Sequence, residues 1–386
     1  VAAAAIGFII LFNSGVATAQ NSRQLSMEQA VELVKTQNLL LRASRMEIEK
    51  SRLKVKEIKS QKLPTVAMET QLQHNIESPV IFMPNFQIDP ATGEFTTGDE
   101  YNAIRAYDKN SYSANLTVST PLFNRSIKAA AAAANAEAVA NEADLMLETS
   151  DKVFETRKLY LQILIAEEQH RLALASLNRA KETLVDTRGL WKNGAALDLD
   201  TLKAFVSVQN LTPNVSKSEK TALLLKQTLA AILDLPSADI VLTDKLEFQN
   251  YERAESSVLL AEMAYSQRPE FLQIAAQNTV LDAATRLEKT NYLPSLTVFA
   301  QGGYNAQSSN MEVWDARWVG SAFTGLKLKV PIFTPTIKPA LQQLDVSRSQ
   351  LSLQKNYLQR MVVTEIESAA INLRNARERL ENQNAN

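Results

Sequence analysis

The hydrophobic positions change their period along the chain. Over residues 26–62 apolar side chains recur at helical spacing and keep one face, with Ser26 as a candidate N-cap. The period then drops to two over residues 65–73, and the same alternation returns over residues 111–120. The pattern therefore predicts a helix followed by two strands, which are joined by a long loop without a clear period over residues 76–110.

The next stretch, residues 122–188, contains neither glycine nor proline and is rich in Ala, Leu, Glu, Lys and Arg. These residues lose little side-chain freedom in a helix, so the stretch predicts one rod of roughly 100 Å. Two glycines and an asparagine over residues 189–194 predict a turn at its end. A return helix is expected over residues 198–235, with a kink or a short break at Pro213.

The same order of elements occurs twice. Adding 230 to the residue number places Leu63-Pro64 on Leu293-Pro294, and past the loop adding 210 places Pro121-Leu122-Phe123 on Pro331-Ile332-Phe333. The second offset is smaller than the first, so the second loop is expected to be shorter by the difference, 230 − 210 = 20. The repeat predicts strands over residues 295–304 and 319–330. It also predicts a second rod from about Thr336, expected by symmetry to continue past Asn386 before it returns.

Composition excludes several classes of protein. The chain has 386 residues, a net charge of −1 and 45% hydrophobic residues, which is unlike a nucleic-acid binder or a disordered chain. It has no cysteine, and its two histidines lie in different elements. Paired carboxylates, a nucleophile elbow, a phosphate-binding loop and a metal-ligand cluster are not recognisable in the sequence. We therefore expect neither an enzyme nor a bound cofactor or metal.

The segment 1–19 is typical of a secretory signal peptide. An apolar run rich in small residues ends in Ala17-Thr18-Ala19 and is followed by polar residues. The basic segment that usually precedes such a run is missing, so we expect an incomplete signal peptide. A membrane anchor is the alternative, although the run is short for a span. Beyond it no stretch approaches 18 apolar residues, so a transmembrane helix is not expected.

The four predicted strands have nearly the length that a tilted strand needs to cross a bilayer, about 9–11 residues. Four such strands cannot close a barrel, for which roughly eight are the usual minimum. Open sheet edges in lipid would leave backbone groups without hydrogen bonds, at several kcal/mol each. The strands must therefore be pooled among subunits, and the rods that follow them would form a second, helical tube.

At this point the chain resembles the TolC-type outer-membrane efflux and secretion channels, also called outer membrane factors. The most specific match is Ala264-Tyr265-Ser266-Gln267-Arg268-Pro269-Glu270-Phe271, which fits the family pattern A-x-x-x-R-P-[DE]-[LF]. The Leu-Pro pairs before the odd-numbered strands and the Pro-aliphatic-Phe triplets after the even ones also fit. So do the spacing of Gly194 and Asp200 and the helix end Leu233-Asp234-Leu235-Pro236. The resemblance covers everything after the signal peptide.

The resemblance implies an α+β membrane protein with two repeats of helix–strand–strand–long helix–helix. As a homotrimer it would build one shared 12-stranded β-barrel on a long periplasmic α-helical barrel, in the bacterial outer membrane. Residues 1–19 would be the incomplete signal peptide and 20–236 the first outer-membrane efflux repeat. Residues 237–254 would be a connecting equatorial segment, and 255–386 a second, C-terminally truncated repeat.

The implied function is the passive exit duct of a tripartite efflux pump or a type I secretion system. Its partners would be a periplasmic adaptor (a membrane fusion protein), an inner-membrane pump and outer-membrane lipid, without nucleic acid. A periplasmic coiled-coil adaptor or scaffold is the alternative. Adaptors typically carry one helical hairpin beside glycine-rich β domains, whereas this chain has two strand–rod units and only ten glycines.

The resemblance also assigns roles near the turn after the first rod. Adaptor docking would involve Gly189, Trp191, Gly194 and Leu197. Asp200, six residues after Gly194, would face the pore, where three copies form a cation-attracting ring at the gate. Asp198 is the alternative ring residue, and a helix-start acid favoured by the helix dipole is the alternative role for either. The family often has a basic residue three or four positions before the glycine, where this chain has Trp191 and Leu190.

Overall fold

A computed structural model describes residues 23–77, 80–88, 90, 92–93, 95–105, 108–235, 240–246 and 257–384. The chain divides into two compact units. The first contains residues 1–47, 143–263 and 369–386, and the second contains residues 48–142 and 264–368. The predicted signal peptide and most of the segment 237–254 lie outside the described residues. Among the described helices none is both long and apolar enough to cross a membrane.

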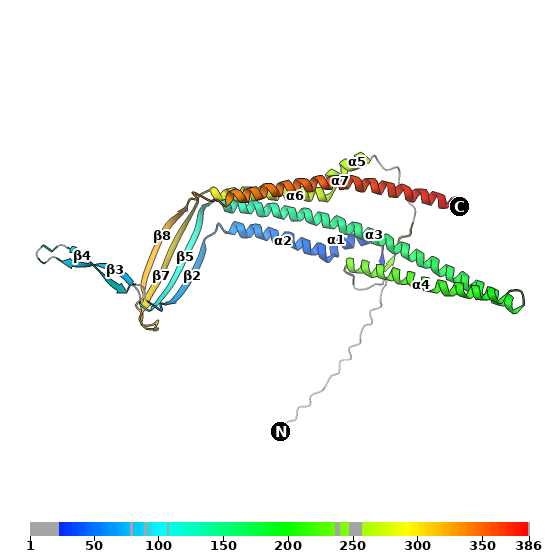
Figure 1. Cartoon of the computed structure of the whole chain (residues 1–386), viewed down its shortest axis with the longest axis horizontal. Coiled ribbons are helices and arrows are strands. Elements are labelled where there is room, and N and C mark those ends of the chain that lie inside the picture. Colours follow the sequence, from blue (N-terminus) through cyan, green and yellow to red (C-terminus); the bar gives the residue numbers. More distant parts are fainter. Residues whose placement is uncertain are drawn as a thin grey trace, which may run out of the picture. The chain divides into compact units, whose positions relative to one another are not determined.

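The second unit contains a four-stranded antiparallel sheet. Its strands are β2 (Thr65–His74), β5 (Asn110–Asn124), β7 (Ser295–Ser308) and β8 (Val319–Lys329), in the spatial order β2-β5-β7-β8 (Figure 1). All four strands predicted from the period-two alternation are confirmed. β5 is longer than predicted because it continues through Pro121, beyond a register shift, along β7.

The expectation of an irregular loop over residues 76–110 is wrong. The segment contains a hairpin of β3 (Val80–Ile88) and β4 (Phe95–Arg105), whose register shifts between Pro84 and Phe86. A shift of this kind interrupts the alternation of side chains, so the strands carry no clear period in the sequence.

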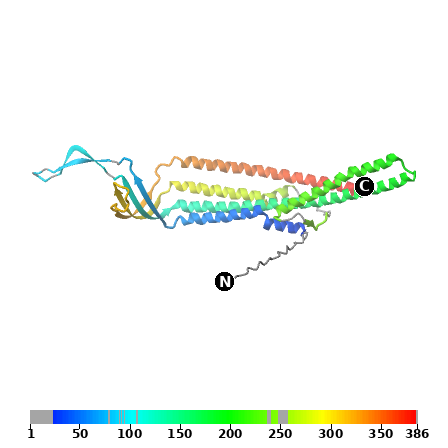
Figure 2. The ribbon, with the colours of Figure 1, turned by 90° about the horizontal axis from the view of Figure 1, so that it is seen from below.

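In the second unit, helical segments extend from one end of the sheet and lie in the same general direction (Figure 2). They belong to α2 (Leu39–Ser60), α3 (Arg125–Lys192), α6 (Pro269–Lys289) and α7 (Ile337–Asn384), and the short 3-10 helix η1 (Thr290–Tyr292) follows α6. Polar contacts join them in pairs. Arg52 binds Glu142 at 2.7 Å between α2 and α3, and Arg348 binds Asp282 at 2.6 Å between α7 and α6.

The single helix predicted over residues 26–62 is two helices, α1 (Met27–Gln37) and α2. Ser26 caps α1 as predicted, in a capping box with Gln29. Asn38 separates the two helices, and its Oδ1 accepts hydrogen bonds from the first backbone N–H groups of α2. Its Nδ2 donates to the carbonyl of Ile232 at 2.7 Å, at the end of α4 (Asp198–Ile232). The apolar period continues across Asn38, which is why the pattern did not reveal the break.

The long rod is confirmed, but its predicted end is wrong. α3 has 68 residues and runs through Gly189 to Lys192, because one glycine inside a helix costs only about 1 kcal/mol. α4 is continuous through Pro213, so the short break that we considered there is not seen. In the first unit α3 and α4 pack through a small core of Leu177, Leu184 and Val208.

The main core of the first unit surrounds Tyr160 on α3. β1 (Arg23–Leu25) pairs in parallel with β6 (Ile240–Leu242), and the Tyr160 hydroxyl donates to the Leu25 carbonyl at 2.9 Å. Leu25, Ile163 and Leu229 pack around the ring, which is fully buried. Burial, together with Asp244 nearby, raises the pKa of Tyr160 to about 12. The structure thus ties the middle of the rod to the two short strands.

Three elements of the second half of the chain begin at a constant distance from their counterparts in the first half. The first residues of α5 (Ser257–Gln267), α6 and β7 correspond to those of α1, α2 and β2, since 257 − 27, 269 − 39 and 295 − 65 all equal 230. Arg268, between α5 and α6, takes the position of Asn38 at the same offset.

Candidate functional site

The four-stranded sheet has two chemically different faces. Residues that oppose one another across all four strands share a face, as in the row Glu69, Asn115, Gly303 and Ser321. That face is mainly polar, and its residues include Gln71, Gln73, Ser111, Ser113, Gln301, Asn305, Gln307, Lys327 and Lys329. Such a face suits contact with water rather than a core.

The opposite face is apolar yet largely uncovered within the described residues. Its side chains include Val66, Met68, Leu72, Leu116, Val118, Val298, Leu326 and Leu328. Met68 is 71% exposed and Leu326 is 65% exposed. Contiguous exposed apolar surface of this kind marks a place where a membrane or another protein binds.

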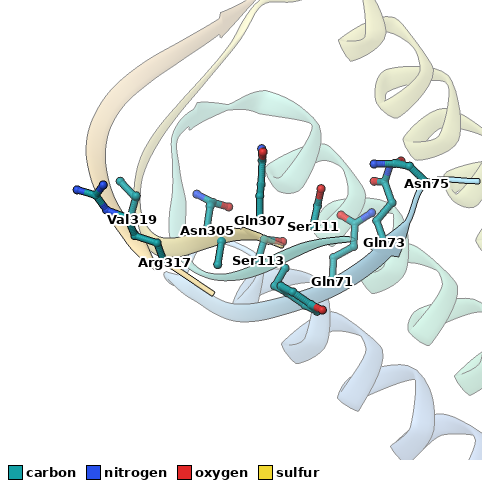
Figure 3. A pocket seen from close by; sticks show the side chains of 11 residues that line it. Gln71, Gln73, Asn75, Ser111, Ser113, Asn305, Gln307, Arg317 and Val319 are labelled. Carbon is teal, nitrogen blue, oxygen red and sulfur yellow. The ribbon is translucent and has the colours of Figure 1, made fainter. Parts of the chain in front are cut away.

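A hollow of about 750 Å³ lies against the sheet near the end of β2. Figure 3 shows Gln71, Gln73, Ser111, Asn305 and Gln307 pointing to the same side of the sheet, from three neighbouring strands. Their amide and hydroxyl groups form hydrogen bonds with water and carry no charge, and the charged residue among those that line the hollow is Arg317. The hollow can hold water or polar solutes, and its chemistry does not select one substrate.

A buried polar contact fixes the sheet beside this hollow. Asn110, the first residue of β5, donates from Nδ2 to the carbonyl of Asn310 at 2.7 Å. Its Oδ1 lies 2.7 Å from Nδ1 of His74 on β2. His74 therefore helps to hold β2 beside β5. Within the described residues no group of three or more acidic or histidine side chains could hold a metal ion.

The turn between α3 and α4 is built around Gly194. The φ angle of Gly194 is +75°, the left-handed conformation that favours glycine after a helix. Its N–H donates to the carbonyl of Trp191 at 3.0 Å, and the N–H of Ala195 donates to that of Leu190 at 2.8 Å. This pair of hydrogen bonds is the Schellman motif. Gly194 thus belongs to the turn, whereas Gly189 lies inside α3.

Large apolar side chains are exposed at this turn. Trp191 is 47% exposed and Leu197 is 69% exposed, and their neighbours Leu190 and Leu199 are also exposed. The turn places three of the four predicted docking residues (Trp191, Gly194 and Leu197) at the end of the helical hairpin. Leu190 and Leu199 were not singled out from the sequence, because leucines at helical spacing usually mark a core.

The two acids at the start of α4 differ in their surroundings. Asp200 Oδ2 accepts a hydrogen bond from the backbone N–H of Leu197 at 3.3 Å. This contact satisfies one free N–H at the helix start, and the acid also lies where the helix dipole favours negative charge. Asp198 is exposed, and its side chain makes no hydrogen bond that the structure records in this region.

Comparison with known proteins shows which solved structures share this fold. No protein-family model and no curated protein matches the chain. The solved outer-membrane channel OprN is similar, with 17% identity over 92% of this chain and 76% of that chain and a TM-score of 0.64.

Two further outer-membrane proteins are similar. The channel CmeC of Campylobacter jejuni shares 16% identity over 93% of this chain and 73% of that chain, with a TM-score of 0.64. The outer membrane protein VceC of Vibrio cholerae shares 14% identity over 93% of this chain and 81% of that chain, with a TM-score of 0.61. The chain has the fold of these outer-membrane channels, which confirms the α+β class and the resemblance at the level of the fold.

Proposed function

We propose that this protein is a TolC-type channel of the bacterial outer membrane, with a periplasmic extension. It acts as the passive exit duct of a tripartite efflux pump or a type I secretion system. The observation that carries the proposal is the two-faced sheet, polar on one face and exposed and apolar on the other, from which the long helices continue. The fold shared with CmeC and OprN supports it.

The chemistry of the sheet fits a channel wall. The apolar side of the sheet contacts lipid, which surrounds the exposed side chains of Met68 and Leu326. The polar side lines a water-filled lumen. β2 and β8, at the two edges of the sheet, cannot stay unpaired in lipid, because each free backbone group costs several kcal/mol there. A homotrimer that pools three such sheets into 12 strands removes these edges.

The two halves of the chain act as two repeats in this proposal. The first occupies residues 20–236 and the second 255–386, with 237–254 as the connecting equatorial segment. The constant offset of 230 between the first residues of α1, α2 and β2 and those of α5, α6 and β7 supports the duplication. Six such repeats in a trimer give the barrel approximate sixfold symmetry.

The turn at Gly194 docks a periplasmic adaptor, which links the duct to an inner-membrane pump. Exposed Trp191 and Leu197 supply the apolar contact area, and the Schellman motif holds the turn in one shape. Gly189, inside α3 and two residues before Trp191, leaves a small surface without a side chain on another side of the helix.

Channel activity is the direct test. The protein purified from membranes in detergent and reconstituted in a planar bilayer should give discrete conductance steps, and native mass spectrometry should give the mass of a trimer. The alternative, a periplasmic coiled-coil scaffold, predicts protein that leaves the cells in the soluble fraction without detergent and gives no conductance. That result would overturn the proposal.

The gate acid can be identified by substitution in the same assay. We expect Asp200→Asn to weaken cation selectivity and to reduce block by multivalent cations, because acidic rings favour cations in a constriction. The matched variant is Asp198→Asn, two residues away on the same helix. If only Asp198→Asn shifts the reversal potential, the ring belongs to Asp198. If neither variant does, Asp200 serves only the helix start, as its hydrogen bond to Leu197 would allow.

A further inference from the structure

We infer that β8 of one copy pairs with β2 of a second copy in a single register, which places Lys329 directly opposite Glu69. The inference rests on the proposed function, in which several copies share one sheet. It names the pairing that joins them, and an ion pair that fixes its register.

The two edge strands are suited to this contact. In the described part of the chain β2 and β8 each have one hydrogen-bonded neighbour, and Figure 1 shows them at the two outer edges of the sheet. Every neighbouring pair is antiparallel, so β2 and β8 run in opposite directions. β8 beside β2 of another copy therefore continues the antiparallel order, and repeated head-to-tail contact can close a ring.

The register follows from the internal repeat. In the hairpin β2–β5 Thr65 opposes Ser119, and in the hairpin β7–β8 Ser295 opposes Lys329. Since 65 + 230 = 295 and 119 + 210 = 329, the two hairpins have the same register at the offsets found in the sequence. The contact of β5 with β7 is therefore the internal counterpart of a contact of β8 with β2 of the next copy.

The known register of β5 and β7 can be carried over residue by residue. Ser119 opposes Phe299 in that pair. Because 119 + 210 = 329 and 299 − 230 = 69, the counterpart pair is Lys329 with Glu69.

Charge and polarity agree with this register. Glu69 and Lys329 are both exposed on the polar face, and neither takes part in an ion pair within the described residues. On the apolar face the same register pairs Leu326 with Leu72. A slip of one residue would place apolar side chains against polar ones along the whole edge. Opposite charges placed directly across two strands attract, so the ion pair favours this register over one that separates the two charges.

The segment after β8 gives a second, independent observation. In the first half, β5 continues through Pro121 to Asn124 along β7. The counterpart, residues 331–334, is not a strand, although it repeats the Pro-aliphatic-Phe motif. Phe123 is 44% exposed, whereas Phe333 is 82% exposed. The first copy of the motif has a neighbouring strand, whereas the second has none among the residues that the structure describes. The inferred register supplies one by placing Pro331 opposite Ala67.

Disulfide crosslinking tests the register, because the chain contains no cysteine. Directly opposed residues in an antiparallel pair have Cα atoms about 4.5–5.5 Å apart, within the range of a disulfide. Within one chain Glu69 and Lys329 lie on opposite edges of the sheet. Glu69 shares a row with Ser321, and Lys329 lies eight residues farther along β8, so the two are roughly 30 Å apart. A disulfide between them must therefore join two copies.

We expect the double variant Glu69→Cys with Lys329→Cys, oxidised in membranes of expressing cells, to give covalent dimers and trimers on non-reducing gels. The matched control, Gln71→Cys with Lys329→Cys, shifts the register by two residues and should give at least roughly five-fold less product. Product from the control in equal or greater amount, or no product from either variant of a protein that remains trimeric, would overturn the register.

Charge reversal provides a second measurement in the absence of cysteine. Lys329→Glu should lower the yield of detergent-stable trimer roughly two- to five-fold, and adding Glu69→Lys should restore it. Lys327→Glu, opposite Gln71 in this register, should have a smaller effect. A trimer indifferent to Lys329→Glu would count against the pair. A wild-type protein that is monomeric in native mass spectrometry would instead refute the proposed function, so the two failures are distinguishable.

Discussion

Replacing Tyr160 with phenylalanine should loosen the junction between the rod and the two short strands of the first unit. The Tyr160 ring is fully buried, and its hydroxyl donates to the carbonyl of Leu25 at 2.9 Å. Phenylalanine keeps the ring and removes only the hydroxyl, which donates this hydrogen bond and also interacts with Asp244. The change therefore leaves no large cavity that the neighbouring side chains would have to fill.

The size of the effect follows from what remains after the change. The Leu25 carbonyl also accepts a hydrogen bond from the N–H of Thr243 at 3.1 Å, so Tyr160→Phe does not leave it without a partner. We therefore expect Tyr160→Phe to lower the stability of this junction by the net contribution of one hydrogen bond, about 1 kcal/mol. Leaving a buried group without a partner would cost roughly 1–3 kcal/mol. For local opening, about 1 kcal/mol corresponds to roughly five-fold faster exchange.

Hydrogen–deuterium exchange of peptides from β1 and β6 measures this opening directly. The Tyr160→Phe protein should exchange roughly five-fold faster there than wild type, and no faster at the turn around Gly194. The matched control is Tyr357→Phe on α7, where the side chain is 66% exposed and no such change is expected. Unchanged exchange in β1 and β6 would refute the view that the hydroxyl holds this junction.

The raised pKa of Tyr160 adds a pH dependence with a definite sign. Its pKa is about 12 in the folded protein and about 10 in the unfolded chain, so the folded state keeps the proton longer. The stabilisation is complete below pH 10 and is lost as the pH rises from 10 toward 12. The advantage of wild type over Tyr160→Phe in thermal unfolding should therefore shrink over this window. An advantage that grew with pH would contradict the burial of a neutral hydroxyl.

Two pairs of glycines give further predictions, each with its own control. Gly303→Ala should reduce the amount of folded protein, because an added Cβ would lie 2.5 Å from the Ala114 carbonyl oxygen on β5, whereas Gly302→Ala meets no atom closer than 3.9 Å. Equal yields would contradict the close approach of β5 and β7. Gly194→Ala should destabilise the α3–α4 hairpin by about 1 kcal/mol because of its positive φ, and Gly189→Ala should stabilise it by roughly 0.5–1 kcal/mol. Circular dichroism melting checks both signs.

The four strands could be predicted from the sequence because alternation and proline positions agreed. Residues 65–73 alternate except at Ala67 and Thr70 and follow Pro64, and the repeat at an offset of 230 supported the same interpretation a second time. The hairpin β3–β4 had neither signal, since its register shifts at Pro84 and the other half of the chain has no counterpart of similar length. Local interruptions of a pattern hide elements that the backbone nevertheless forms.

The helix ends were predicted less well, for a related reason. Asn38 divides α1 from α2 by accepting hydrogen bonds at Oδ1 and donating one to Ile232, a residue 194 positions later. Gly189 was expected in the turn but lies in α3, because the turn needs a positive φ at only one residue, Gly194. A choice between two glycines is decided by the backbone geometry of the whole turn, which composition does not contain.

Periodicity also leaves open what covers an apolar face. Val34 on α1 and Val66 on β2 contribute equally to an apolar pattern, yet Val34 is fully buried in the core around Tyr160 and Val66 is 66% exposed. A period of 3.6 or 2 says only that one face avoids water, and lipid, another copy or the same chain can each satisfy it. The length of the strands and the edges of the sheet separate these cases. These strands are long enough for a bilayer, and within the described residues the two edges of the sheet lack neighbours. Such a sheet needs partners outside the chain. The exposed apolar residues of this sheet therefore argue for assembly in a membrane.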